Sequence, residues 1–391
     1  MNAVESFSMR AAFVTSLALL SLVTGCSSSK QFYCLVLFGD SITNSGNTYY
    51  PETCPPSVVS STIAPMCEWS GQLTLEMQVP TNNLGQSGDQ SEDMTLKVYK
   101  NYTPQRSNNP TTAILIGQND ERICGDTAGC LGNFSTSMMA ALTWITVPPG
   151  SNKIYAQHAS NNGCAADNTV GIGLAMKCES AGNSITIALP TTTNNQPVYV
   201  AWLGQDDNSG EATLAIDGIT VESLHASSTY GHVIYTNNES TTTVWGRRYV
   251  VVSPGTHTIE FTVTSTSGFF EPIWVGTPDY STVNTLGSPR VFVGDPIYEA
   301  NGGDVQNTTD FTNTLDDLIA QLNSDGLQVI HVPTHDFVVP STDMSGADTT
   351  TPDGILCIGN AQYVGWYGQH PNNCGFWHIR QAFESRILPA Q

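Results

Sequence analysis

The sequence predicts an α/β fold, with a parallel sheet between helices, that is interrupted by an inserted antiparallel β-sandwich. Three observations predict it. Short apolar runs without polar alternation are typical of strands buried on both faces, as in a parallel sheet. Segments of helical period separate these runs. From about residue 151 to about residue 283 the period changes to the alternation of half-buried strands.

The first strand of the α/β part is the apolar run Phe32–Phe38, which is too short for a good helix. A Gly39-Asp40-Ser41 turn follows it directly. Because α/β proteins place their sites at the carboxyl ends of strands, Ser41 is a candidate nucleophile. A serine after a strand also commonly caps the following helix, so the turn alone leaves both roles open.

The α/β pattern continues to about residue 148. It predicts a buried strand over Thr112–Ile116 and helices over Trp69–Met77, Ser91–Tyr99 and Phe134–Ile145. A glycine-bearing turn lies at Asn83–Asp89, and Gly117–Asp120 follows the strand. We expect both turns near Ser41, because the carboxyl ends of parallel strands lie at one edge of a sheet.

The inserted region predicts antiparallel strands separated by turn residues at regular intervals, as in a β-sandwich. These strands are expected over Ile185–Leu189, Val198–Leu203, Ala212–Ile216 and Thr256–Val263. Asp217-Gly218 indicates a tight turn between two strands. Four aromatic residues are candidates for stacking on sugar rings, although burial in the core is the commoner fate of each: Trp202, Tyr230, Tyr235 and Trp245.

The α/β pattern returns after about residue 284. It predicts strands over Pro289–Val293 and Leu327–Val332, a helix over Thr312–Asn323 that ends at Gly326, and a last helix from about Gly375 to Ile387. His370 lies in a polar segment before that helix. The spacing of His331, His335 and Asp336 resembles a metal site, but no further ligand cluster is visible in the sequence, so none is predicted.

Composition and the amino end indicate an exported protein. The chain has 391 residues, enough for two units, and a formal net charge of −21, which opposes nucleic-acid binding. Residues 1–26 resemble a lipoprotein-type signal peptide, because Arg10 precedes the apolar run Ala11–Val23 and small residues lead to Cys26. Ending on Cys26 implies lipidation of this cysteine, which we expect, although Glu5 and the short spacer after Cys26 argue against it. We expect a secreted protein, or an outer-surface or periplasmic lipoprotein, of a bacterium.

The cysteines favour disulfides. Leaving aside Cys26 and Cys34, eight cysteines form neighbouring couples, and each couple brackets a loop. Local pairing is the simplest of the 105 possibilities. It predicts Cys54–Cys67, Cys124–Cys130, Cys164–Cys178 and Cys357–Cys374. Zinc is the competing explanation, but no CxxC occurs and thiolate sites belong mostly to reducing compartments.

The polar segments together supply the parts of acyl transfer. Ser41 would lose its proton to the imidazole of His370 as it attacks a carbonyl. A backbone N–H in the glycine-bearing turn and the side-chain amide of Asn119 would stabilise the negative oxygen. Each part alone has an ordinary structural explanation, as a cap, a turn or a surface loop.

In this order, the segments resemble the blocks of the GDSL/SGNH hydrolase family of serine esterases and lipases. The four blocks are Phe38–Ile42, Asn83–Gly88, Gly117–Asp120 and His370–Gly375. The resemblance covers roughly residues 30–148 and 284–391. It implies Ser41 as the nucleophile, His370 as its base, and an oxyanion hole of the Ser41 and Gly88 N–H groups with the Asn119 amide.

The resemblance also implies a fold and an activity. The fold is a flavodoxin-like three-layer sandwich with a parallel five-stranded sheet. The insert, residues 149–283, resembles galactose-binding or carbohydrate-binding modules in pattern. The expected reaction is hydrolysis of a carboxylic ester, in an acetylated carbohydrate, a short-acyl ester or a lipid, through an acyl-enzyme. No cofactor or metal is expected, and membrane contact is expected only through a lipid anchor.

One position departs from the family pattern. The family usually has Asp three residues before the histidine, where this chain has Tyr367. Asp353 is the first candidate for the missing acid; Asp336 and a backbone carbonyl, which would leave a Ser–His dyad, are the alternatives. The departure motivates a second hypothesis, a catalytically weak or inactive relative that acts as a surface carbohydrate-binding protein. Acyl transfer to a sugar is a third.

Overall fold

The fold is described from a computed structural model. It describes residues 35–44, 68–77, 79, 81–102, 111–147, 153–168, 172–189, 194–205, 210–225, 242–251, 253–278, 290–298, 305–345, 347–351, 354, 356–357 and 370–388. Several sequence predictions lie outside these residues: the signal over residues 1–26 with Cys26, the Cys54–Cys67 pair, Tyr230, Tyr235, Asp353 and Tyr367.

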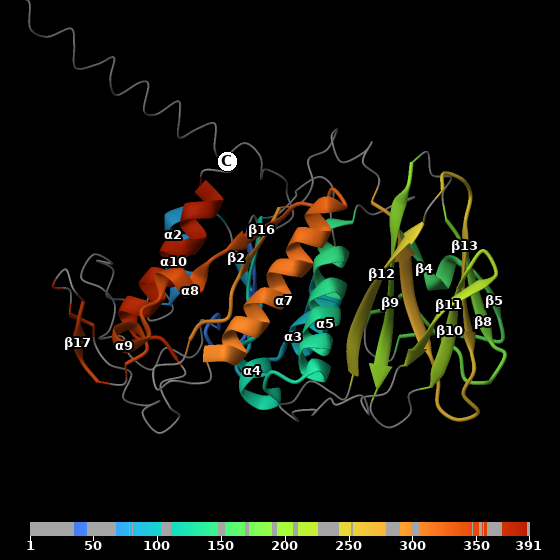
Figure 1. The fold of residues 1–391 in the computed structure, drawn as a ribbon, viewed down its shortest axis with the longest axis horizontal. Helices are drawn as coiled ribbons and strands as arrows, with labels where there is room; N and C mark the ends of the chain where they lie inside the picture. Colours follow the sequence, from blue (N-terminus) through green and yellow to red (C-terminus); the bar gives the residue numbers. More distant parts are fainter. Residues whose placement is uncertain are drawn as a thin grey trace, which may run out of the picture.

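A five-stranded parallel sheet forms the centre of the α/β part, as the sequence predicts (Figure 1). Its strands are β1 (Leu35–Gly39), β2 (Thr81–Asn83), β3 (Thr111–Leu115), β15 (Val291–Gly294) and β16 (Val329–Val332). Their spatial order is β2-β1-β3-β15-β16, the flavodoxin-like order. This order reverses between β1 and β3, which is where α/β proteins bind ligands at the carboxyl ends of strands.

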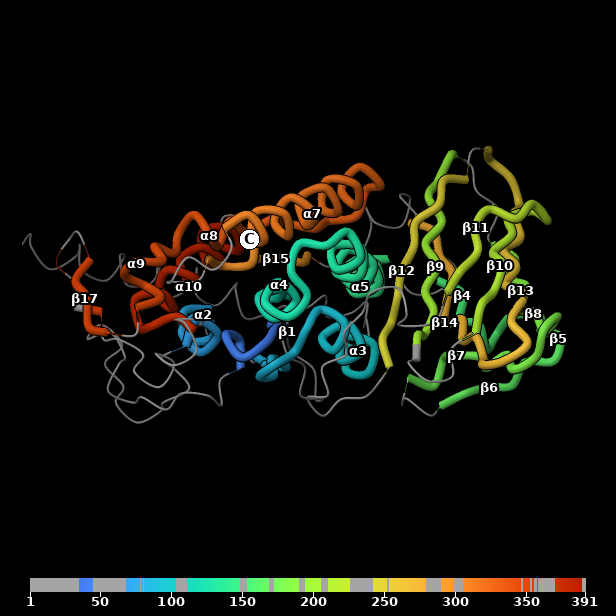
Figure 2. The backbone as a smooth tube through the Cα atoms, turned by 60° about the horizontal axis from the view of Figure 1, so that its bottom comes forward, coloured from blue at the N-terminus to red at the C-terminus, as the bar shows by residue number. Residues whose placement is uncertain are grey.

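Helices cover both faces of this sheet (Figures 1 and 2). On one face lie α2 (Trp69–Met77) and α10 (Asn373–Ile387); on the other lie α3 (Ser91–Asn101), α5 (Ala128–Thr146) and α7 (Val305–Ser324). In β1, Leu35 and Leu37 belong to the core between the sheet and the helices α2 and α10. Val36 and Phe38 belong to the core on the opposite face, with α3, α5 and α7. Burial on both faces explains why the strand shows no polar alternation.

Several helices differ from their predicted bounds. The helix expected over Phe134–Ile145 begins at Ala128, and the one expected over Thr312–Asn323 begins at Val305. Elements of the α/β part that were not predicted include the strand β2, the helices α4 (Gln118–Cys124), α8 (Thr334–Phe337) and α9 (Pro340–Asp343), and the hairpin of β17 (Thr349–Thr350) and β18 (Leu356–Cys357). None of the helices in the described ranges is both long and apolar enough to cross a bilayer.

Three of the four predicted disulfides are present. They join Cys124 to Cys130, Cys164 to Cys178 and Cys357 to Cys374. The first does not close a long loop, because it connects the end of α4 to the first turn of α5. Disulfides form in oxidising compartments, so these three fit an exported protein.

The insert is a β-sandwich of two antiparallel sheets. The five-stranded sheet contains β5 (Ser160–Asn162), β8 (Ser184–Ala188), β13 (Thr258–Val263), β10 (Glu211–Ile216) and β11 (Ile219–His225). The four-stranded sheet contains β12 (Thr242–Val251), β9 (Gln196–Gln205), β14 (Glu271–Gly276) and β4 (Lys153–Tyr155). A hairpin of β6 (Ala165–Asp167) and β7 (Ala175–Lys177) and the turn η4 (Ala156–His158) complete it. Asp217 and Gly218 both have positive φ, as a tight hairpin turn requires.

The four-stranded sheet is buried on both faces. Alternate residues of β9, such as Val200 and Trp202, lie in the sandwich core, whereas Tyr199 and Ala201 join the core built by α3 and α5. At Gly246 in β12, an added Cβ would lie 2.7 Å from a backbone nitrogen of α5, so only glycine permits this approach. The sandwich and the α/β part therefore share one continuous core.

Polar contacts reinforce this shared core. Asp325, directly after α7, accepts two hydrogen bonds from Arg248 of β12, each 2.6 Å long, and a third from the hydroxyl of Tyr199. The indole N–H of Trp274 in β14 donates to the hydroxyl of Tyr99 in α3 at 2.7 Å. Buried polar groups thus find partners across the boundary, which fixes the sandwich on the helices.

Candidate active site

Ser41 lies in a tight turn directly after β1. Glycine is required at position 39, because an added Cβ would lie 2.2 Å from the carbonyl oxygen of Leu115. The buried side-chain carboxylate of Asp40 accepts a hydrogen bond from the Ile42 N–H at 2.8 Å. The backbone carbonyl of Asp40 accepts hydrogen bonds from the Thr43 and Asn44 N–H groups. These bonds fix the turn that carries the serine hydroxyl.

The structure brings His370 to this hydroxyl. Ser41 Oγ lies 2.6 Å from His370 Nε2, across 329 positions of sequence. His370 precedes α10, whose amino end is capped by the side chain of Asn372, and the Asn372 N–H donates to the Asp343 carbonyl at 2.7 Å. The disulfide from Cys374 to Cys357 anchors the same turn. The histidine is therefore positioned by a cap, a backbone bond and a covalent link.

The protonation of His370 suits a base. Burial, together with the positive charge of Arg122, lowers the pKa of its imidazole to about 4. The ring is therefore neutral near pH 7, so Nε2 can accept the hydrogen of the Ser41 hydroxyl at the distance observed. Arg122 belongs to α4, so the charge that acts on His370 comes from the element that also carries Asn119.

The two predicted oxyanion donors lie next to each other. Gly88 has a φ of +85°, which a glycine adopts without strain. Asn119 Nδ2 donates to the carbonyl of Asp89 at 2.9 Å, so the asparagine is held against this turn. The turn that carries Gly88 is also joined to the segment that carries Ser41, because the Gln86 N–H donates to the Gly39 carbonyl at 3.0 Å. The amide of Asn119 retains a second hydrogen that can serve a ligand.

The structure adds supporting residues that sequence reasoning missed. Arg122 Nη2 donates to Asn119 Oδ1 at 3.0 Å, which sets the orientation of the amide. Asp120 accepts hydrogen bonds from the N–H and hydroxyl of Ser91, at the amino end of α3. The signal for Arg122 was its place three residues after Asn119, where helical neighbours meet, but Gly117–Asp120 had been interpreted as a turn.

A narrow hollow lies beside the nucleophile turn, at the carboxyl ends of β1, β3 and β15. Its lining residues are Asp40, Ile42, Leu115, Ile116, Gln118, Pro296 and Ile297. It is too narrow to hold a water molecule, so among the described residues it is not a preformed acyl pocket.

The acid partner of His370 remains a prediction. Asp353, the first candidate, and Tyr367, which occupies the usual acid position, both lie outside the described residues. Asp336, the second candidate, lies in α8 and faces His335, with Oδ1 3.2 Å from His335 Nε2. The structure therefore assigns Asp336 to a different histidine.

Two of the four candidates for sugar stacking lie in the core, the commoner fate that the sequence analysis gave for each. Trp202 and Trp245 are only 3% and 7% exposed, and their rings contact each other edge to face in the sandwich core. Both lie in the four-stranded sheet, whose second face is covered by α3 and α5. That sheet therefore cannot offer an open aromatic face to a glycan.

Several solved structures resemble about a third of this chain. No protein-family model matches the chain, and no curated protein sequence matches it. A carbohydrate-binding module of family 36, solved with calcium and xylotriose, is 15% identical, with 32% of this chain and 98% of that one covered and a TM-score of 0.25. For a family 35 module from Clostridium thermocellum the identity is 13%, the coverage 32% and 96%, and the TM-score 0.24. The family 6 module of LamC from Zobellia galactanivorans is 15% identical, with 32% of this chain and 98% of that one covered and a TM-score of 0.24.

Proposed function

We propose that this chain is an exported serine ester hydrolase of the SGNH type. The observation that carries the proposal is the 2.6 Å contact between Ser41 Oγ and His370 Nε2. Around it lie the Gly88 turn and the Asn119 amide, at the edge of a flavodoxin-like sheet. A nucleophile paired with its base beside preplaced donors is the arrangement that acyl transfer requires.

The reaction proceeds in two steps. The Ser41 hydroxyl attacks the ester carbonyl while its proton passes to His370 Nε2, and the carbonyl oxygen becomes negative. The N–H groups of Ser41 and Gly88, with Asn119 Nδ2, donate to this oxygen. The imidazolium then protonates the departing alcohol, which leaves an acyl-serine. Water, deprotonated by His370, attacks the acyl-serine; the bond to Ser41 Oγ then breaks, the carboxylic acid leaves, and the imidazolium returns its proton to Ser41.

The substrate class follows from charge. A net charge of −21 repels anionic membranes and polyanions, so a neutral ester is favoured. Acetylated polysaccharide and short-acyl esters meet this condition better than anionic phospholipid does. We therefore propose an acetylated carbohydrate as the first substrate class to test.

A fluorophosphonate probe tests the nucleophile. It should add one covalent group to the peptide that contains Ser41, and Ser41→Ala or His370→Ala should abolish labelling. Ser385→Ala, which changes a serine of α10 bonded to the Ala382 carbonyl, is the matched control and should label like the native protein. Folded native protein whose mass is unchanged by the probe would refute the proposal.

A second candidate is carbohydrate binding by the sandwich without catalysis. The observation that favours it is the sandwich itself, a complete two-sheet unit with its own core. Since the four-stranded sheet is covered on both faces, such binding would use the five-stranded sheet or the loop ends. Affinity electrophoresis on xylan and laminarin, with native protein and Ser41→Ala, separates the two functions. Retention without any ester turnover by the native protein would favour the second.

A further inference from the structure

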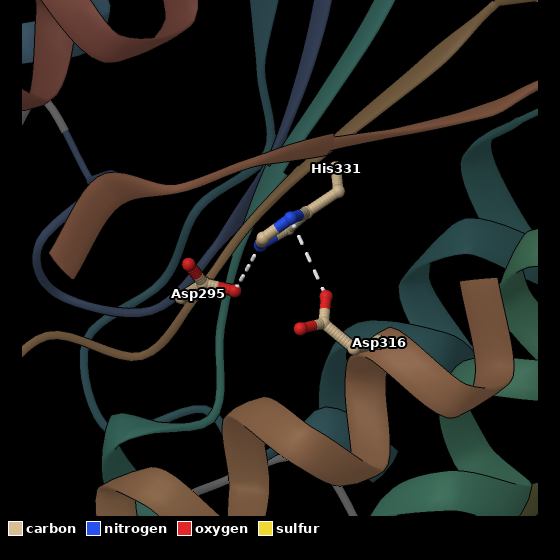
Figure 3. A group of neighbouring side chains, drawn as sticks. All are labelled: Asp295, Asp316 and His331. Carbon is tan, nitrogen blue, oxygen red and sulfur yellow. Dashed lines mark hydrogen bonds and ion pairs between the residues drawn. The ribbon is translucent and has the colours of Figure 1, made fainter. Parts of the chain in front are cut away.

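A histidine–carboxylate cluster lies at the same sheet edge, two strands away from β1. Asp295 follows β15 directly and its side chain is completely buried. Asp295 Oδ1 lies 2.5 Å from His331 Nε2, and Oδ2 lies 2.6 Å from His335 Nδ1 (Figure 3 shows the first contact). One carboxylate thus holds two imidazole rings in place.

The other nitrogen of His331 faces a second carboxylate. Its Nδ1 lies 3.3 Å from Asp316 Oδ1 on α7, on the opposite side of the ring from Asp295 (Figure 3). A carboxylate only accepts hydrogen bonds, so Nε2 must carry the ring hydrogen toward Asp295. The Nδ1 lone pair of the neutral ring would then face a carboxylate oxygen. Two such acceptors repel unless a proton or a metal ion lies between them.

The distance between His331 Nδ1 and Asp316 Oδ1 is compatible with a bound metal ion. A charge-assisted hydrogen bond from nitrogen to carboxylate is about 2.7–2.9 Å long. Two ligand atoms bound at about 2.0–2.1 Å to a tetrahedral zinc lie about 3.3 Å apart. The observed separation of 3.3 Å matches this spacing of two metal ligands. A metal-bound histidine also usually donates its other N–H to a carboxylate, which is the role of Asp295 here.

We propose that His331 Nδ1 and Asp316 bind a divalent transition metal ion of the Zn²⁺ class, with Asp295 holding the ring. Asp295, Asp316 and His331 each offer a ligand atom within 4.8 Å of the others. Asp316 and His331 are partly exposed, so an ion can enter and water can complete its coordination. The proposal does not rest on the proposed esterase activity.

The sequence did not predict this site. The spacing of His331, His335 and Asp336 suggested ligands from one segment, whereas the partners of His331 come from two other elements, the end of β15 and α7. The fold thus brings together a histidine–carboxylate cluster that was not visible in the sequence. The segment after Asp295 also reaches the candidate active site, because the Ile297 N–H donates to the side chain of Gln118 at 3.2 Å.

Calorimetric titration of metal-depleted full chain with ZnCl₂ tests the proposal. We expect native protein to bind one Zn²⁺, and Asp316→Asn and His331→Gln to bind it at least about tenfold more weakly. Asp317→Asn is the matched control, because it removes an equal charge from an exposed position of the same helix and should bind like the native protein.

Circular dichroism of the metal-free variants checks that each is folded. His331→Gln could disturb β16, so the exposed Asp316→Asn variant keeps the test valid if that protein misfolds. Failure of native protein to bind Zn²⁺ in a one-to-one ratio would overturn the proposal, since a proton would then suffice. Equal Zn²⁺ affinity of Asp316→Asn and native protein would overturn it too.

Discussion

Replacing Asp325 with alanine tests whether the sandwich and the α/β part unfold together. The Asp325 side chain is 4% exposed and accepts both hydrogen bonds of a bidentate Arg248 contact, while Arg248 itself is 20% exposed. Removing one partner of a buried ion pair costs about 3–5 kcal/mol. Because Arg248 keeps some contact with water, we take the lower value, about 3 kcal/mol.

The resulting shift in melting temperature depends on the size of the unit that unfolds. The entropy of unfolding is about 2.1 cal/mol/K per residue. For a unit of roughly 300 residues this gives about 0.6 kcal/mol/K, so a loss of 3 kcal/mol lowers the Tm by about 5 °C. For a sandwich of roughly 120 residues unfolding alone, the same loss would lower its Tm by about 12 °C.

Differential scanning calorimetry measures both the number of transitions and the shift. We expect one transition in native protein, lowered by about 5 °C in Asp325→Ala, because the two parts share a core. Asp317→Asn, an exposed change on α7, should shift it by less than about 1 °C. Two separate transitions in native protein, of which Asp325→Ala moves only one, would refute the reasoning.

Three further predictions concern the candidate active site. Asn119→Ala removes one oxyanion donor, so kcat on 4-nitrophenyl acetate should fall about 10²–10³-fold; a loss smaller than tenfold would exclude Asn119 from that role. Because the pKa of His370 is lowered to about 4, kcat/KM should stay level from pH 8 down to about pH 5; an acid limb near pH 6.5 would instead indicate a carboxylate on the ring. Burial raises the pKa of Asp40 and of Asp120 to about 7, so these carboxyls hold protons more tightly in the folded state. Their contribution to stability is complete below about pH 4 and is lost as the pH rises through 7. The urea concentration at the midpoint of unfolding should therefore decrease as the pH is raised from 5 to 8; an increase over this interval would contradict the prediction.

The parallel sheet was predictable because burial on both faces leaves a plain trace in sequence. Leu35–Phe38 is apolar without interruption, and its alternate side chains do enter two different cores. Ser41 and His370 were predictable for another reason. Locally each had an ordinary explanation, as a cap or a surface loop, and it was the resemblance of their segments to GDSL/SGNH blocks that joined them; the fold places them 2.6 Å apart.

The burial of the four-stranded sheet on both faces was not predicted, although its strand β9 also contains an apolar run without polar alternation. Val198–Leu203 is also uninterrupted by polar residues, yet it was interpreted as half-buried because its neighbours alternate. Its second face is covered by α3 and α5, which precede it by many residues in the chain. A pattern within one strand shows that both faces are covered, but it does not show by what.

Arg122 and the histidine–carboxylate cluster show what residue spacing alone cannot predict. Arg122 would have been found had Gln118–Cys124 been recognised as a helix, since it lies one turn from Asn119. Asp316 offered no such signal, because its relation to His331 depends on how α7 packs beside β16. Contacts between distant elements are set by tertiary packing, which local periodicity does not encode.

The 329 positions between Ser41 and His370 also set an order of events during biosynthesis. At about 5–20 residues per second, the ribosome finishes the imidazole roughly 15–65 s after the hydroxyl. A nascent polypeptide that lacks residue 370 thus carries an ordinary alcohol at residue 41. The Ser41–His370 contact can form only when α10 docks, so any chemistry of this pair requires the chain to be synthesised at least as far as that helix.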